Sequence, residues 1–307
     1  MEPAPGPELL EGAAVALGGP RGLPVTRTLP NRRRRMVGAW CFLDAYGPDD
    51  LTGTRGMRVG PHPHTGLQTV SWLVSGEILH TDSLGSRQEI RPGQLNLMTA
   101  GRGIAHAEQT PARHSGQLQG VQLWVALPGT DRDVPPAFDN HADLPVVADG
   151  GLSATILLGT LAGATSPARC YTPLVGAEVT LTGDARLDLR TDFEYAVLTL
   201  DGAPTVDGVT LKPGPLLYLG DGRSSVSFGT DGPARVLLLG GEPFDEKIVM
   251  WWNFVARDHD EIVEARQDWA ESMNTGGRFG VVGGYDGDPM PAPPMPITRL
   301  VPRGRLR

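Results

Sequence analysis

Four side chains that could bind a metal stand in two pairs. His62 and His64 are separated by one residue, and His106 and Glu108 repeat that spacing. In a β-strand, residues i and i+2 point to the same face. Two such strands lying side by side would therefore aim three imidazoles and one carboxylate at a common point. This donor set suits a divalent transition metal such as iron, manganese, nickel, copper or zinc, so the spacing predicts a metalloprotein.

The neighbourhood of these pairs adds two expectations. Glu108 supplies the only carboxylate, and a charge that points into a barrel needs a cation as partner. Gln68 follows His64 by four residues and faces the same side if the strand is regular. It would then hydrogen-bond a metal-bound water or a substrate, the alternative being an ordinary strand amide. The remaining histidines have no partner at ligand spacing and are interpreted as structural or surface residues: His80, His114, His141 and His259.

Length and composition predict an all-β chain. With 307 residues, 40% of them hydrophobic, the chain can form two domains with proper cores. Its 41 glycines and 28 prolines favour short strands joined by tight turns over long helices. Segments such as Thr69–Val74 and Val121–Val125 end at turn signals, which is typical of a β-sandwich or barrel.

A faint internal repeat predicts two barrels in tandem. Ile90–Met98 resembles Leu211–Leu219 in the second half of the chain. Counting within the second copy puts residues such as Asp188 and Ser227 where the first has its histidines, and after His141 the only histidine is His259. The first barrel is therefore expected to hold the metal, and the second to be structural or regulatory.

We accordingly divide the chain into four parts. Residues 1–24 are expected to be a partly mobile segment, 25–148 the metal-binding domain, 149–255 a second domain without a metal site, and 256–307 a helix and a Pro-rich tail. The helix is expected over 258–269, because acidic residues open it and Ile262, Ala265 and Trp269 form one apolar stripe. The tail from Asp288 onward is expected to be extended.

Charge and targeting signals limit the partners. The formal net charge of −8 argues against direct binding to nucleic acid or to an anionic membrane. The run Arg32–Arg35 is interpreted as a solvated surface segment rather than a nuclear-localisation signal or a phosphate contact. Two distant cysteines, Cys41 and Cys170, suit a reducing compartment. No signal peptide or membrane-length apolar run is evident, so a soluble, cytoplasmic protein is expected.

Several stretches resemble the pirin family, a branch of the cupin superfamily. They are His62–Val70, Met98–Glu108, Gln119–Pro128 and Gly240–Pro243. The resemblance implies two jelly-roll cupin barrels, a bicupin, with iron in the N-terminal barrel as Fe(II). The ligands would be His62, His64, His106 and Glu108. The four-arginine run and the Pro-rich tail are interpreted as marks of a bacterial subgroup.

The resemblance implies two hypotheses for function. The first is an iron-dependent dioxygenase of quercetinase type that acts on a flavonol-like substrate, with Glu108 as general base. The alternative is a non-enzymatic module that senses iron or redox state and regulates a protein partner. A zinc-type isomerase or hydrolase is a third option, because one fold hosts many chemistries. The family's usual His-Arg-Gly-Phe-Glu reads His64-Thr65-Gly66-Leu67-Gln68 here, a change expected to make the cavity less charged.

Overall fold

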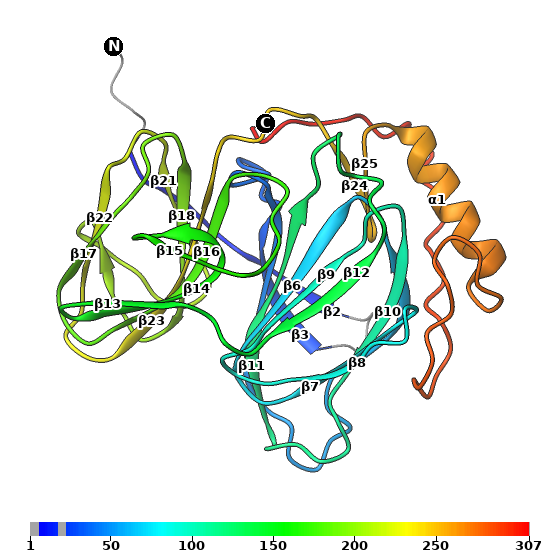
Figure 1. Cartoon of the computed structure of the whole chain (residues 1–307), viewed down its shortest axis with the longest axis horizontal. Helices are drawn as coiled ribbons and strands as arrows, with labels where there is room; N and C mark the ends of the chain where they lie inside the picture. The colour runs from blue at the N-terminus through cyan, green and yellow to red at the C-terminus, as the bar shows by residue number, and fades with distance from the viewer. Residues whose placement is uncertain (1–5, 18–22, 307) are drawn as a thin grey trace.

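The computed structural model describes residues 6–17 and 23–306 and contains two β-barrel domains side by side (Figure 1). Within these residues almost all regular structure is β-strand, and the one helix, α1 (His259–Ser272), lies at the far edge of the first domain. The prediction of an all-β chain with two tandem barrels and a short C-terminal helix is confirmed. None of the described helices is long and apolar enough to cross a membrane.

The N-terminal barrel packs a seven-stranded antiparallel sheet against a four-stranded one. The large sheet has the order β12-β9-β6-β11-β4-β3-β2, and the small sheet has the order β5-β10-β7-β8. The strands are β2 (Ala13–Leu17), β3 (Leu23–Leu29), β4 (Trp40–Asp50), β5 (Arg58–His64), β6 (Leu67–Ser75), β7 (Ile78–Asp82), β8 (Arg87–Ile90), β9 (Leu95–Thr99), β10 (Ile104–Gln109), β11 (Gln117–Ala126) and β12 (Ala137–His141).

The C-terminal barrel repeats this arrangement with an eight-stranded and a four-stranded sheet. The large sheet has the order β1-β21-β18-β23-β16-β14-β13, with β15 paired to β14, and the small one has the order β17-β22-β19-β20. The strands are β1 (Glu8–Leu10), β13 (Val146–Asp149), β14 (Leu152–Leu161), β15 (Ala164–Thr165), β16 (Leu174–Leu181), β17 (Ala185–Asp188), β18 (Glu194–Asp201), β19 (Thr205–Val206), β20 (Val209–Thr210), β21 (Leu216–Gly220), β22 (Ser225–Gly229) and β23 (Ala234–Gly241). The pair β17–β22 corresponds to β5–β10 of the first barrel and carries Asp188 and Ser227.

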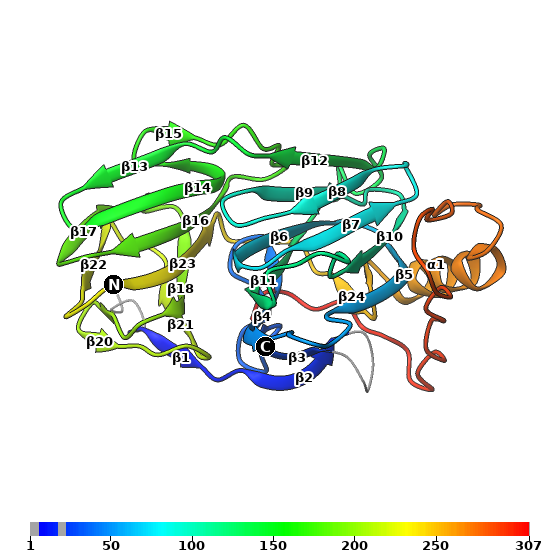
Figure 2. The same ribbon diagram turned by 90° about the horizontal axis from the view of Figure 1, so that it is seen from below.

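The N-terminal segment belongs to both domains. Residues 1–24 were expected to be partly mobile, but Glu8–Leu10 pairs with β21 of the second barrel and Ala13–Leu17 pairs with β3 of the first. Figure 2 shows this segment running beneath both domains. Composition hid the two strands because their backbone groups are satisfied by partners more than 200 and about 10 residues away, respectively. The parts of this prediction on residues 1–5 and 18–22 lie outside the described residues.

The two barrels share a buried interface. Trp40 is fully buried, and its indole Nε1 lies 3.1 Å from the carbonyl oxygens of Val175 and Gly240 in the second barrel. The carboxylate of Glu194 crosses in the other direction and accepts a 2.7 Å hydrogen bond from the backbone N–H of Gly38. One apolar core runs through this contact without a break.

After the second barrel the chain returns to the first one. A hairpin of β24 (Val249–Trp251) and β25 (Phe254–Ala256) lies against the end of β5, where Val255 N–H donates to Thr65 O at 3.0 Å. The second domain was expected to extend to residue 255, yet this hairpin packs on the first barrel. Helix α1 follows and begins as predicted, because Asp258 caps it by accepting hydrogen bonds from the N–H groups of Asp260 and Glu261.

Helix α1 buries the predicted stripe of Ile262, Ala265 and Trp269. The tail beyond it forms no helix or named strand among residues 288–306, in agreement with the expected extended conformation. It runs back across the molecule (Figure 1) and pairs through Arg303 with Ile248.

The arginine run is only partly a solvated segment. Arg32 and Arg33 are exposed, whereas Arg34 is buried, with its guanidinium 3.3 Å from the centroid of the Tyr218 ring. Arg34 also lies 3.5 Å from Glu194. The solvated interpretation fails for this residue because the second barrel supplies a carboxylate and an aromatic face that local sequence does not reveal.

Candidate metal centre

The two predicted ligand pairs lie on neighbouring strands. β5 and β10 are antiparallel partners, with His106 directly opposite His62 and Ile104 opposite His64. The Nε2 atoms of His64 and His106 are 3.1 Å apart. The three ring centroids of His62, His64 and His106 are 4.3 to 5.0 Å from one another. The i, i+2 spacing therefore brings three imidazoles together as expected.

Glu108 lies slightly apart from the three histidines. The β5–β10 register shifts between His106 and Glu108, so Glu108 pairs with Val59 rather than with Gly60. As a result, a carboxylate oxygen of Glu108 and ring nitrogens of His106 and His80 lie within 4.8 Å of one another. Ring nitrogens of His62, His64 and His106 form a second group of the same kind. His106 is the donor that the two groups share.

Backbone carbonyls orient the first two imidazoles. His62 Nδ1 lies 2.8 Å from Gly60 O, and His64 Nδ1 lies 2.9 Å from Asn253 O. A carbonyl oxygen only accepts hydrogen bonds, so each Nδ1 must carry the proton and each Nε2 must present a lone pair. Asn253 belongs to the turn of the β24–β25 hairpin, so this hairpin supplies an acceptor to the site.

Burial keeps all three histidines neutral. Burial lowers the pKa of His62 from its ordinary value of 6.5 to about 4. The pKa values of His64 and His106 lie well below 6.5, mainly because of burial and then because of the neighbouring histidines. Neutral imidazoles, each with one ring-nitrogen lone pair, are the donors that borderline divalent transition metals prefer. The residues present thus fit such a metal.

Glu108 is a buried carboxyl group beside the three histidines. Burial raises its pKa, and the electrostatic interaction with His80 and a hydrogen bond from Ser71 act in the opposite direction. Ser71 Oγ lies 3.2 Å from a Glu108 oxygen and 2.8 Å from the amide oxygen position of Gln122. One hydroxyl proton cannot serve both acceptors, so the Gln122 amide must turn its NH₂ toward Ser71 for Ser71 to donate to Glu108.

A cavity of about 500 Å³ opens beside these donors. Its aromatic wall comes from Phe42, Trp124 and Trp252, and the first two rings are stacked at 4.0 Å. Gln122 and Asn253 add polar groups. Such a size and lining are typical of small-molecule sites.

The Pro-rich tail forms another wall of the cavity. Met290, Pro291 and Pro293 line it. The N–H of Met290 donates to Pro61 O at 2.8 Å, and its carbonyl accepts from the Trp269 indole at 2.8 Å. The sequence did not connect the tail with the site, because Met290 lies 226 positions after His64 and no local pattern reports such a contact.

Gln68 does not face the metal centre. Its amide nitrogen donates to Thr99 Oγ1 at 2.9 Å and to Arg169 O at 3.1 Å, outside the cavity. The expectation assumed one regular strand, but a turn at Gly66, with φ of +69°, separates β5 from β6. The alternative, an ordinary strand amide, is the one observed. Thr65 and Leu67 do not line the cavity either.

His80 is a site residue that sequence reasoning missed. It is buried on β7 beside His106, with the two Nδ1 atoms 3.4 Å apart, and its Nε2 lies 3.1 Å from Asp82 Oδ2. The signal was present, since His80 and Asp82 have the same i, i+2 spacing as the ligand pairs. The sequence does not show that β7 pairs with β10, and without that pairing nothing places His80 beside His106.

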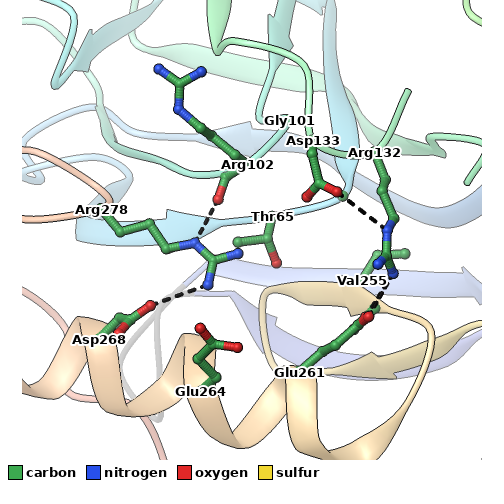
Figure 3. Close-up of a pocket in the computed structure, with 12 residues that line it drawn as sticks. Thr65, Gly101, Arg102, Arg132, Asp133, Val255, Glu261, Glu264, Asp268 and Arg278 are labelled. Carbon is green, nitrogen blue, oxygen red and sulfur yellow. Dashed lines mark hydrogen bonds and ion pairs between the residues drawn. The ribbon is translucent and has the colours of Figure 1, made fainter. Parts of the chain in front are cut away.

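A second cavity, of about 380 Å³, lies between the barrel rim and α1 (Figure 3). Here Glu261 pairs with Arg132 at 2.7 Å, and Asp268 pairs with Arg278 at 3.1 Å. Among the described residues, the candidate groups of metal donors lie in the barrel and include none of the residues that line this second cavity. We therefore assign the functional site to the barrel cavity.

The metal-free protein should lose stability as the pH falls from 6.5 toward 4. Below pH 6.5 the unfolded chain takes up protons at His62, whereas the folded chain, with a pKa of about 4, does not. Folding therefore becomes less favourable as the pH drops, by roughly 2 kcal/mol from His62 at pH 5. Urea unfolding of chelator-treated protein at pH 7 and pH 5 measures this. The variant His62→Gln should show a smaller decrease, and an equal decrease in both proteins would contradict the prediction.

Comparisons with known proteins agree with this architecture. The family model Pirin matches residues 22–125, and the model of the Pirin C-terminal cupin domain matches residues 176–275. A Pseudomonas aeruginosa protein named "Putative quercetin 2,3-dioxygenase" is 48% identical over 92% of this chain and 89% of its own length. A Pirin-like protein of Caulobacter vibrioides is 38% identical over 80% of this chain and 87% of its own.

Solved structures give the same answer. The crystal structure of a quercetin 2,3-dioxygenase from Acinetobacter baumannii superposes with a TM-score of 0.90 at 42% identity, covering 95% of this chain and 96% of that one. The predicted resemblance is therefore confirmed, and the chain belongs to the pirin family of cupin proteins.

Proposed function

We propose that this protein is a metal-dependent dioxygenase of the quercetin 2,3-dioxygenase type. The metal would be Fe(II), held by His62, His64, His106 and Glu108 in the N-terminal barrel. The observation that carries the proposal is the convergence of three neutral imidazoles at a cavity of about 500 Å³. The names of two relatives that align over most of the chain support it.

The cavity fits a planar aromatic substrate with several oxygens, such as a flavonol. The stacked rings of Phe42 and Trp124 and the indole of Trp252 supply flat apolar surfaces. Aromatic surfaces of this kind favour offset or edge contacts with a flat ring system. Gln122 and Asn253 supply hydrogen-bonding groups for the oxygens.

The chain's own groups account for binding and proton transfer. When bound, the metal would supply Lewis acidity, which acidifies a coordinated hydroxyl group, and a redox centre for dioxygen. Glu108 would accept the proton of the substrate hydroxyl on a carboxylate oxygen, since its burial raises its pKa toward that of a useful base. The Ser71 hydroxyl would orient this carboxylate by donating a hydrogen bond to Glu108 Oε1.

Oxygen uptake tests the proposal. Protein loaded anaerobically with Fe(II) is given quercetin and air-saturated buffer, and dioxygen is followed with an electrode. We expect uptake that requires both iron and quercetin. Bound iron without uptake would contradict the dioxygenase and favour a metal-dependent binding module with a protein partner.

The tail wall should contribute to substrate binding. Met290→Ala removes an apolar side chain from the cavity, while the backbone of residue 290 keeps its hydrogen bonds to Pro61 and Trp269. We expect KM for quercetin to rise about threefold to tenfold with kcat little changed, as for lost uniform binding of roughly 1 kcal/mol. Met295→Ala is the matched control, because Met295 packs on the α1 core outside the cavity. Equal KM values in the two variants would exclude the tail from the substrate site.

A further inference from the structure

The third imidazole of the metal centre is oriented differently from the other two. The Nδ1 atoms of His62 and His64 face backbone carbonyls, which only accept hydrogen bonds. The Nδ1 of His106 faces the Nδ1 of His80 at 3.4 Å instead. An imidazole nitrogen can donate or accept, so this contact alone leaves the proton position on His106 open.

Asp82 resolves the proton positions along this chain of contacts. Its Oδ1 accepts hydrogen bonds from the N–H groups of Leu84 and Ser86, each at 2.9 Å, and its Oδ2 lies 3.1 Å from His80 Nε2. A carboxylate accepts, so in a neutral His80 the Nε2 atom carries the proton and the Nδ1 atom has the lone pair. His80 Nδ1 can then accept only from a protonated His106 Nδ1, which leaves the lone pair of His106 on Nε2.

The pair is built into the barrel rather than placed at its surface. The side chains of His80 and Asp82 are 3% and 0% exposed. The His80 ring stacks on Phe138 with centroids 4.2 Å apart and planes 12° apart. On the neighbouring strand, His106 lies opposite Asp82 and Glu108 lies opposite His80. Stacking and strand pairing together hold the His80 ring in its contact with His106.

We propose that Asp82 and His80 are positioning residues that set the tautomer of His106, so that its Nε2 lone pair faces the metal. The inference rests on the proposed metal site. Outer partners of metal-binding histidines commonly change metal affinity 10- to 100-fold when they are removed. In this protein the outer partner of one ligand is itself a histidine, anchored by a carboxylate.

Asp82→Asn should reverse the tautomers. The two backbone N–H groups at Leu84 and Ser86 hold the amide oxygen of the new side chain, so its NH₂ group faces His80 Nε2. His80 must then accept at Nε2 and donate at Nδ1, which moves the proton of His106 to Nε2. We expect nitrogen NMR of the metal-free protein to report an Nδ1-protonated His106 in the native protein and an Nε2-protonated one in Asp82→Asn.

A pair of His80 variants separates positioning from mere packing. The amide oxygen of His80→Gln can still accept from His106 Nδ1, whereas His80→Leu fills space without an acceptor. Titration with Co(II), followed by its ligand-field absorption, should give an affinity within about threefold of native for His80→Gln. The affinity should fall about 10- to 100-fold for His80→Leu and Asp82→Asn. His141→Gln, on β12 with Phe138, is the matched control and should bind as the native protein does.

The outcomes separate this inference from the proposed function. Native Co(II) affinity in both His80→Leu and Asp82→Asn, with an unchanged His106 tautomer, would overturn the positioning role. Equal losses in His80→Gln and His80→Leu would overturn it too, because an acceptor would then not be what matters. Failure of the native protein to bind Co(II) would overturn the metal site, while the tautomers of the metal-free protein would still decide the role of Asp82 and His80.

Discussion

Replacing His106 by alanine should abolish metal binding and, with it, dioxygen uptake. His106 belongs to both overlapping groups of candidate donors, with His62 and His64 on one side and with His80 and Glu108 on the other. Its loss leaves neither group with three ligands. The effect should therefore exceed the roughly 10- to 100-fold cost of removing an outer partner.

Metal content and activity are measured on the same preparations of His106→Ala. After anaerobic loading with Fe(II) and removal of free metal, we expect near-stoichiometric iron in the native protein and background iron in the variant. His114→Ala is the matched control, because His114 lies outside the cavity and accepts a hydrogen bond from Gly116 N–H in its own turn. Activity that survives in His106→Ala would place the reaction elsewhere in the molecule.

Replacing Glu194 by alanine should strongly lower the free energy of unfolding. The carboxylate is fully buried and accepts hydrogen bonds from Gly38 N–H at 2.7 Å, Tyr218 Oη at 2.7 Å and Arg305 Nη1 at 2.8 Å, and Arg34 lies 3.5 Å away. Without this carboxylate, hydrogen-bond donors from three parts of the chain lose their acceptor, and the buried guanidinium of Arg34 loses its counter-charge. Breaking a buried ion pair on one side costs about 3–5 kcal/mol.

Urea unfolding at pH 7 measures the loss of stability in Glu194→Ala. Glu264→Ala is the matched control on the exposed face of α1, where such changes stay within about 0.5 kcal/mol. Because Arg305 lies in the tail, faster hydrogen exchange of residues 301–306 should accompany the loss. Unchanged stability would show that the contact between the barrels does not depend on this carboxylate.

The N-terminal ligand pairs were predictable because their spacing is a local property. The pleat of a strand puts His62 and His64 on one face. The same rule predicts the position of His106, whereas the register shift after His106 sets Glu108 slightly apart. The same holds for α1, where Asp258 and the stripe of Ile262 and Ala265 encode the helix start and its buried face. Turn-rich composition likewise predicts strands without tertiary information.

The failures occurred where a turn or a distant partner decides. Gln68 was expected at the metal because periodicity was continued through Gly66, but a positive φ there resets the direction of the chain. His80 was dismissed because the partner of its strand, β10, lies more than 20 residues away. In both cases the spacing along one strand was used where a turn or the pairing with another strand sets the position of the side chain.

The sequence by itself determined the strand-rich class, the two barrels, the helix that follows them, and the types and spacing of the candidate ligands. These depend on backbone periodicity and on the residues within a few positions. Only the tertiary structure decided that β7 lies beside β10, that residues of the tail line the cavity, and that Glu194 hydrogen-bonds across the contact between the barrels. Each of those contacts brings together residues far apart in the chain, and it forms because burial and hydrogen-bond satisfaction are properties of the whole packed molecule.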